Sequence, residues 1–328
     1  MRVKLRSPGW DNAGSFVRRF LSTEYAVVLF YLAVAALLFY PMLQGQIVAP
    51  GDARVYYYPW KMYYGSMLSR GFPLWTTHEF TGISYIGNSE SGVLYPPNFF
   101  FFVWRSAYSY NLMLLLHYVA SATFTYLYLK LICGKRLPAL FGGLAFGMAG
   151  FMAAHKGHPN MINGAAWLPL LMYIYERMCR EPRVSLAISA SLVIAAQLFT
   201  GHYQVPLYTY IVLLIFTAYN LVDRKRGGRM RFTLLCLAPL AAGIVLALPQ
   251  LLATRELSGL CLRPKNGYTF FTGSSMNPWL FVQFVFPFIY TSNYGKGLYG
   301  PGNFTESSGF VGVLVLVMAA VAVIRCFR

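Results

Sequence analysis

Two acidic residues in the first half of this chain have the setting of residues that take part in catalysis. Asp52 follows a Pro-Gly turn, and Glu90 lies in a segment rich in glycine, serine and proline. Either carboxylate could act as a general base that takes the proton of a reacting hydroxyl group. Asp52 has a structural alternative as a turn or helix N-cap residue, and Glu90 has one as an ordinary solvated loop acid.

A second set of polar residues combines imidazole groups with a lysine. His155, Lys156 and His158 lie close together in Ala-His-Lys-Gly-His-Pro-Asn, and His202 and Gln204 occur in Thr-Gly-His-Tyr-Gln. Such side chains suit the anionic oxygens of a phosphate and the hydroxyl groups of a sugar. Zinc would need further ligands, which only His202 or an acid could supply, and the five cysteines have no metal-binding spacing. We therefore predict no metal ligand among these residues.

The elements that carry these residues are long apolar runs. The chain is 57% hydrophobic and 11% charged, whereas soluble domains are about 25% charged. A transmembrane helix needs roughly 20 mostly apolar residues. We therefore predict an all-α polytopic membrane protein with about eight transmembrane helices. They are expected at residues 25–43, 112–129, 138–154, 161–175, 184–200, 205–222, 232–253 and 309–324.

The charges predict the orientation of these helices. Most of the 27 basic residues flank the apolar runs on the side that a cytoplasmic N-terminus would place inside. This is the positive-inside pattern, and it accounts for the net charge of +17 without nucleic-acid binding. We predict a multi-pass protein of the cell (inner) membrane. Asp52, Glu90 and the histidine segments then share the outer face.

The same topology divides the chain. Residues 1–24 form a cytoplasmic segment, 25–253 form the main transmembrane module with a first outer loop at 44–110, and 254–308 form a second outer loop. Residues 309–328 hold the eighth transmembrane helix and a basic end. Residues 55–68 are dense in Tyr and Trp, which favour the membrane interface, so we expect interfacial helices there. Alternatively, these aromatic residues pack the loop itself.

The order of several short motifs resembles the YfhO-type family of bacterial membrane proteins, over residues 49–250. That family is similar to the GT-C glycosyltransferases. The resemblance implies a GT-C-like fold, a polyprenyl-phosphate sugar donor, an acceptor on the outer face, and a catalytic Asp in the first outer loop, which is Asp52 here. The motifs are Gly-Asp at 51–52, Gly-Phe-Pro-Leu-Trp at 71–75, Ser-Gly-Val-Leu-Tyr-Pro at 91–96, Ala-Trp-Leu-Pro-Leu at 166–170 and Gly-His-Tyr-Gln at 201–204.

The chain departs from the family pattern in two ways. Arg54 stands where an Asp-x-Asp motif would have its second acid, so a divalent metal bridged by paired loop acids is not expected. A divalent metal bound in another way is left open, and no cofactor is named. Family members are usually longer. We therefore expect this chain to cover the N-terminal part of the pattern, as a fragment or as a short relative.

These observations predict an inverting glycosyltransferase that moves a sugar to a cell-envelope polymer, a lipid or a protein. Asp52 is the predicted base and Glu90 a second catalytic carboxylate. Outer cations would stabilise the departing phosphate, with Arg255 preferred because it directly follows the seventh transmembrane helix. The other candidate cations are Arg54, Lys61, Arg105, Lys156, Arg263, Lys265 and Lys296. The predicted substrate-binding residues are Arg54, Trp75, His155, Lys156, His158, His202, Gln204 and Arg255.

Two other functions fit a polytopic chain: a transporter or flippase of lipids or sugars, and a non-catalytic envelope assembly factor. Transporters place ionisable groups near the middle of the bilayer. Here His117 is the central one, and a role in helix packing explains it. An assembly factor would not need acids and histidines gathered on one face. The polar residues therefore favour an enzyme at the membrane surface.

Overall fold

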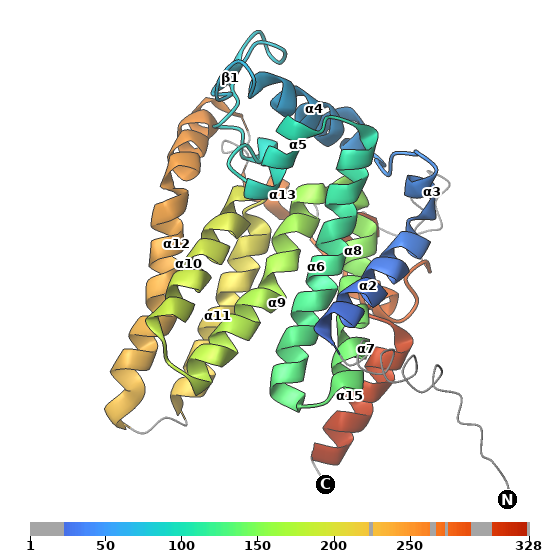
Figure 1. Ribbon diagram of the computed structural model, residues 1–328, viewed down its shortest axis with the longest axis vertical. Helices are drawn as coiled ribbons and strands as arrows, with labels where there is room; N and C mark the ends of the chain where they lie inside the picture. Colours follow the sequence, from blue (N-terminus) through green and yellow to red (C-terminus); the bar gives the residue numbers. More distant parts are fainter. Residues whose placement is uncertain (1–22, 223–225, 263–266, 273–274, 290–303, 327–328) are drawn as a thin grey trace, which may run out of the picture.

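The computed structural model describes residues 23–222, 226–262, 267–272, 275–289 and 304–326. The predicted cytoplasmic segment 1–24 lies almost wholly outside this part of the chain. The molecule is a bundle of long helices, and one end of the bundle is covered by shorter elements (Figure 1). The helices of the bundle are α2 (Glu24–Leu38), α6 (Ala107–Cys133), α7 (Arg136–Gly147), α8 (Gly150–Ala154), α9 (Pro159–Arg180), α10 (Val184–Phe199), α11 (Gln204–Val222), α12 (Arg226–Leu260) and α15 (Val313–Cys326).

A helix forms at each of the predicted apolar runs, but not all of these helices have the length of a transmembrane segment. Among the described residues, four are long and apolar enough to cross a membrane: Ala107–Cys133, Arg136–Gly157, Gln204–Val222 and Gly228–Leu260. Three others, Glu24–Leu38, Val184–Phe199 and Val313–Cys326, are apolar but shorter. The all-α membrane architecture is therefore supported, and the number of eight crossings stays a prediction.

The bundle packs around α6 and α9. Helix α6 begins with a capping box between Ser106 and Ser109 and ends at Gly134, whose φ of 65° is the left-handed conformation that glycine favours. It packs against α2, α7 and α9, while α12 packs against α10. Small residues permit the close approach of α7, because a Cβ at Gly147 would lie 2.8 Å from the Ala122 methyl carbon.

The first loop, residues 44–106, covers one end of the bundle (Figure 1). Three of its large aromatic side chains, Trp60, Tyr64 and Tyr85, are buried with Val93 in a small core of their own. No aromatic residue of 55–68 is exposed, so these residues pack the loop, as the alternative interpretation held. Its elements are α3 (Tyr40–Leu43, at its start), η1 (Ala53–Tyr57), α4 (Tyr58–Met67), the antiparallel strands β1 (Trp75–Thr76) and β2 (Ile83–Ser84), η2 (Ser89–Ser91), η3 (Pro96–Phe99) and α5 (Phe100–Val103).

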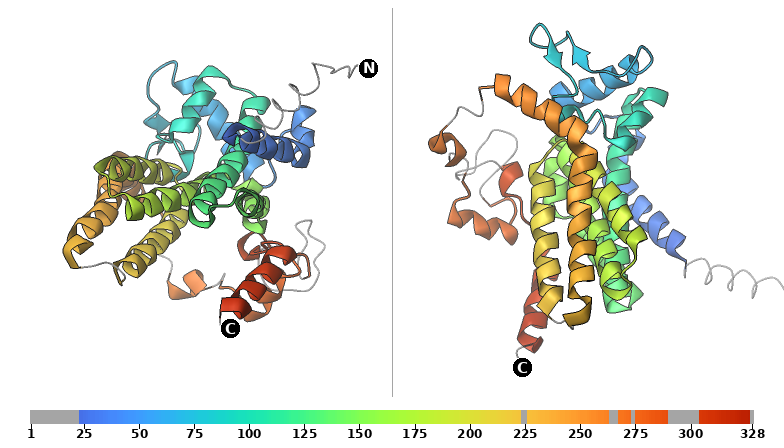
Figure 2. Two further views of the ribbon diagram at one scale, coloured as in Figure 1. Left: turned by 60° about the horizontal axis from the view of Figure 1, so that its bottom comes forward. Right: turned by 90° about the vertical axis from the view of Figure 1, so that its left-hand side faces the viewer.

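The second loop follows α12 and lies to one side of the bundle (Figure 2). Its described elements are α13 (Tyr268–Thr272), η6 (Pro278–Phe284) and α14 (Phe304–Ser307). The Gly150 N–H group donates a 2.6 Å hydrogen bond to the Phe310 carbonyl and ties this region to α8. Helix α15, which follows, has no buried residue. The predicted cations Arg263, Lys265 and Lys296 lie outside the described residues.

Candidate functional site

Four segments that are distant in the sequence meet where the first loop covers the bundle. They are the turn before η1, the η2 segment, the connection between α8 and α9 (η4, His155–Gly157), and the turn between α10 and α11. Hydrogen bonds, an ion pair and ring contacts join their side chains. We call this group the polar cluster. Its members are Asp52, Tyr57, Glu90, His155, His158, Asn160 and His202.

Glu90 is the centre of the polar cluster. The Tyr57 hydroxyl donates to Glu90 Oε2 at 2.6 Å, and Asn160 Nδ2 donates to the same oxygen at 3.2 Å and to the Glu90 carbonyl at 2.7 Å. His202 Nδ1 lies 3.0 Å from Oε1. Two of the three donors, Asn160 and His202, come from elements far from the first loop. Glu90 is therefore not the solvated loop acid of the alternative interpretation.

These donors determine the charge of Glu90. Burial alone would raise its pKa, because burial removes the carboxylate from water. The hydrogen bonds from His202, Tyr57 and Asn160 outweigh burial, so the pKa lies below its ordinary value of 4.5. Burial, and then the charge of Glu90, raise the pKa of Tyr57, which keeps its proton and stays a donor. At neutral pH the cluster therefore contains an ionised carboxylate.

The backbone around Glu90 is held by buried side chains. Lys61 Nζ donates to the Ser91 carbonyl at 2.8 Å, the Tyr64 hydroxyl donates to the Val93 carbonyl at 2.9 Å, and Asn98 Nδ2 donates to the Gly92 carbonyl at 2.7 Å. Lys61 is only 2% exposed. A buried carbonyl without a partner is costly, so these bonds fix one conformation of the segment.

Gly201 allows the α10–α11 turn to approach η2. Its φ is +88°, and a Cβ at this position would lie 1.8 Å from the Ser89 carbonyl oxygen. Only glycine fits such a contact in this backbone conformation. The next residue along the chain is His202. The glycine in Gly-His-Tyr-Gln therefore brings the His202 ring to Glu90.

Asp52 forms a second and more open pair. Its Oδ2 atom lies 3.2 Å from His158 Nε2, and 63% of the Asp52 side chain is exposed, against 27% for His158. Asp52 directly precedes η1, and its side chain forms no cap hydrogen bond, so the N-cap alternative is wrong. The turn alternative is confirmed, because the Ala53 N–H group donates to the Pro50 carbonyl at 3.2 Å. The preceding Gly51 has a φ of +53°, as a Pro-Gly turn requires. Asp52 thus lies at the solvent-exposed edge of the polar cluster.

Three polar atoms of the cluster are buried without a hydrogen-bond partner among the described residues: His155 Nε2, His158 Nδ1 and Asn160 Oδ1. His155 Nδ1 must donate to the Phe151 carbonyl at 2.7 Å, because a carbonyl only accepts. His155 Nε2 is therefore an acceptor in the neutral ring, as Asn160 Oδ1 always is. All three atoms have almost no accessible surface, so a ligand would contact them only after the surrounding side chains had moved.

Several predicted substrate-binding residues lie outside the polar cluster. Gln204 donates to the Tyr208 hydroxyl on its own helix at 2.6 Å. Lys156 Nζ lies over the Phe39 ring, 5.9 Å from its centroid. Trp75 is 58% exposed and belongs to the β1–β2 hairpin.

Among the predicted cations, Arg54 and Arg255 are exposed and form no side-chain ion pair or hydrogen bond within the described residues. Arg105 is used structurally, because Nη1 donates to the Gly65 carbonyl at 2.9 Å. No described group of three or more His, Cys, Asp or Glu side chains could hold a metal ion.

Three residues that support the site were not among the predicted site residues. Tyr57 belongs to the aromatic stretch that was interpreted as interfacial, and Asn160 follows the His-Pro pair at the start of α9. Lys61 was predicted only as a candidate phosphate-binding cation. Asn160 lies two residues after His158, and this short spacing could have suggested that the two side chains belong to one site. The residues next to Tyr57 and Lys61 in the sequence give no such indication.

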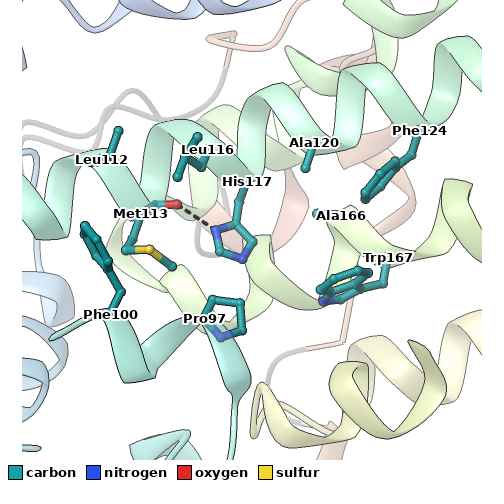
Figure 3. Close-up of a pocket in the computed structure, with 10 residues that line it drawn as sticks. All are labelled: Pro97, Phe100, Leu112, Met113, Leu116, His117, Ala120, Phe124, Ala166 and Trp167. Carbon is teal, nitrogen blue, oxygen red and sulfur yellow. Dashed lines mark hydrogen bonds between the residues drawn. The ribbon is translucent and has the colours of Figure 1, made fainter. Parts of the chain in front are cut away.

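An apolar pocket of about 360 Å³ lies between the first loop and the helices of the bundle (Figure 3). Its walls come from η3, α5, α6 and α9. Asn160 of the cluster and Trp167 of the pocket are seven residues apart, so they share a face of α9 at a separation of about 10 Å. The lining residues are Pro97, Phe100, Leu112, Met113, Leu116, His117, Ala120, Phe124, Ala166 and Trp167.

The polar groups beside this pocket satisfy one another. Trp167 Nε1 donates to the Tyr95 oxygen at 3.1 Å, and the Tyr95 hydroxyl lies 2.6 Å from His117 Nε2. His117 Nδ1 donates to the Met113 carbonyl at 2.6 Å, as Figure 3 shows. The prediction that His117 forms hydrogen bonds in helix packing is confirmed. The surface that the pocket offers to a ligand is therefore apolar.

The chain matches no protein-family model, no curated protein and no solved structure. The resemblance to the YfhO-type family and to the GT-C fold therefore rests on the sequence motifs. Two of these motifs contribute directly to the polar cluster: Gly-Asp supplies Asp52, and Gly-His-Tyr-Gln supplies His202.

Proposed function

We propose that this chain is a membrane glycosyltransferase that moves a sugar from a polyprenyl-phosphate donor to an acceptor outside the cell membrane. The proposal rests on one spatial relation: Asn160 of the polar cluster and Trp167 of the apolar pocket are seven residues apart on one face of α9, which corresponds to about 10 Å along the helix. The pocket suits the hydrocarbon chain of a lipid, and the cluster suits its polar head. A lipid-linked sugar contains both parts in one molecule.

The chemistry of the cluster fits this substrate class. Transfer needs a base for the acceptor hydroxyl, and the cluster offers two carboxylate–imidazole pairs. In the proposed complex, Arg54, Lys156 and Arg255 supply positive charge to the departing phosphate from around the cluster. The donor would approach along α9, with the N-terminus of the chain in the cytoplasm and the cluster outside the inner membrane.

One observation favours transport as a second candidate function. His117 is buried within a long apolar helix, where ionisable residues usually have a functional role. A flippase would use the same pocket but would leave the bond between sugar and phosphate intact. A glycosyltransferase and a flippase therefore give different products, so one membrane preparation can distinguish the two functions.

The test is transfer of labelled sugar in membranes that contain the full chain, with a panel of polyprenyl-phosphate sugars and extracted envelope acceptors. The double variant Asp52→Asn/Glu90→Gln removes both carboxylates of the cluster and should lower the rate by about a hundredfold or more. Glu256→Gln is the matched control, because Glu256 is an exposed acid at the end of α12. An intact donor that only changes its side of the membrane would support the flippase instead, and equal rates in all three proteins would contradict the proposal.

A further inference from the structure

The two carboxylate–imidazole pairs of the cluster differ in how firmly they are held. In the Asp52–His158 pair, 63% of the acid side chain is exposed. In the Glu90–His202 pair, exposure is 28% for the acid and 23% for the imidazole. Glu90 also accepts hydrogen bonds from Tyr57, whose side chain is buried, and from Asn160. The second pair is therefore fixed in position before any substrate arrives.

The contact with Glu90 determines which nitrogen of His202 is available. An ionised carboxylate only accepts hydrogen bonds, so Nδ1 carries the proton in the neutral ring. The lone pair then lies on Nε2. His202 Nε2 forms no hydrogen bond within the described residues. It also differs from His155 Nε2 and His158 Nδ1, which are buried without a partner. A carboxylate behind an imidazole orients the ring and stabilises the imidazolium that forms when the ring takes a proton.

We propose that His202 is the proton acceptor in the transfer reaction, and that Glu90, Tyr57 and Asn160 are positioning residues that hold its ring. This inference rests on the proposed glycosyl transfer, and it moves the role of base from Asp52 to His202. The acceptor oxygen forms the new bond to the anomeric carbon, and the bond from that carbon to the phosphate oxygen breaks. The phosphate keeps the electron pair of the broken bond, and the hydroxyl proton moves to His202 Nε2.

Asp52 has a different part in this scheme. Its carboxylate pairs with His158 at the open edge of the cluster, where Tyr57 and His155 also contact the His158 ring. Asp52 thus holds the orientation of the His158 ring at the edge of the cluster. Loss of Asp52 weakens this orientation but leaves the proton acceptor in place. Asp52→Asn is therefore expected to be less damaging than any change that removes His202.

Chemical rescue in the sugar-transfer assay tests the proposal. His202→Ala should lower the rate by about a hundredfold or more, and added imidazole should restore part of it. Glu90→Gln should also be slow but should not respond to imidazole, because its His202 ring is still present. Asp52→Asn should lose less than about tenfold. His78→Ala is the control, because the His78 ring contacts Tyr63 outside the cluster.

Two results would overturn the proposal. One is a transfer rate of His202→Ala close to that of the wild type. The other is a complete loss of transfer in Asp52→Asn while His202→Ala still transfers sugar. A measurement without turnover separates this inference from the proposed function. Diethyl pyrocarbonate should modify His202 at Nε2 in the folded chain and spare the buried His155 ring. If the wild type transfers no sugar, the proposed function fails. If His202 is not modified, the assignment of Nε2 fails by itself.

Discussion

The loop between α2 and α6 and the loop between α12 and α15 are both long and rich in aromatic residues. In the first loop, Trp60, Tyr64 and Tyr85 are at most 6% exposed and form a small core. In the described part of the second loop, Trp279 is 75% exposed and Phe281 is 62% exposed. Similar composition therefore gives a small aromatic core in the first loop, and large exposed aromatic rings in the described part of the second.

Buried polar side chains stabilise the first loop. In the first loop, Lys61, Tyr64 and Asn98 donate to carbonyl groups of the segment that follows Glu90, and Gln250 of α12 donates to the Ile86 carbonyl at 2.5 Å. Each of these bonds removes an alternative backbone conformation. A loop stabilised in this way can hold a carboxylate in a fixed position, which a reactive site requires.

The second loop has a surface of another kind. Its exposed Trp279, Phe281, Phe286 and Phe288 side chains are typical of a segment that contacts lipid or another protein. One buried apolar residue, Leu280, anchors η6. Both loops are therefore rich in aromatic residues, and in the loop that carries the site buried side chains also donate hydrogen bonds to the backbone.

The largest effect is expected at the contact between the first loop and the α10–α11 turn. Gly201→Val should cost about 3 kcal/mol or more of unfolding free energy, because the new Cβ would overlap the Ser89 carbonyl and the φ of +88° is strained for valine. Thermal unfolding in detergent measures the loss. Gly259→Ala is the control, since nothing lies within 4 Å of its Cβ position. Equal stability of the two variants would contradict the close approach of this turn.

A matched pair of asparagines tests the two loops against each other. Asn98→Ala removes one of the two donors to the Gly92 carbonyl, which still accepts from the Tyr95 N–H group at 3.1 Å, and should cost about 1–1.5 kcal/mol. Asn277→Ala removes an exposed cap that accepts from the Trp279 N–H group, and should cost about 1 kcal/mol or less. Unfolding midpoints in detergent give both values. A larger loss of unfolding free energy in Asn277→Ala than in Asn98→Ala would contradict the interpretation that hydrogen bonds hold the first loop more firmly.

The pH dependence of stability should expose the cost of the buried lysine. Burial lowers the pKa of Lys61 to about 7, although the charge of Glu90 opposes this shift, and the ordinary value is 10.5. Between these two values the unfolded chain binds a proton that the folded chain has lost, so stability should rise as the pH increases through this window. Lys61→Met should remove this contribution.

The measurement is the unfolding temperature at pH 7, 8 and 9 in the wild type and in Lys61→Met. Lys130→Met is the control, because Lys130 is exposed and pairs with Glu24 far from the first loop. It should keep the slope of the wild type. Identical slopes in the wild type and in Lys61→Met would show that Lys61 titrates as it does in the unfolded chain.

The helices could be predicted from the sequence because apolar length and the absence of charge determine them. The apolar run at 112–129 lies within α6 and the run at 205–222 lies within α11. The number of crossings could not be confirmed in the same way, because α2, α10 and α15 are short. The meeting of Asp52, Glu90 and His202 at one end follows from loops that share one side of the bundle.

The internal order of the site could not be predicted, because it depends on tertiary contacts. Nothing in the sequence near Tyr57 distinguishes it from Tyr56 and Tyr58, and only the fold turns its hydroxyl to Glu90. Asn160 acts on Glu90 from a position 70 residues along the chain. Periodicity contains no information about such pairs, whereas Gly201 shows that a glycine beside a candidate residue can mark a close contact.

The smallest effect is expected on the surface of the second loop. Trp279→Ser should change the unfolding free energy by no more than about 0.5 kcal/mol in detergent, because the ring is 75% exposed. Trp60→Ser is the matched variant in the first loop and should cost about 3–5 kcal/mol, since its ring is buried and donates to Glu79. A cost above about 2 kcal/mol for Trp279→Ser would mean that the second loop also folds around a core.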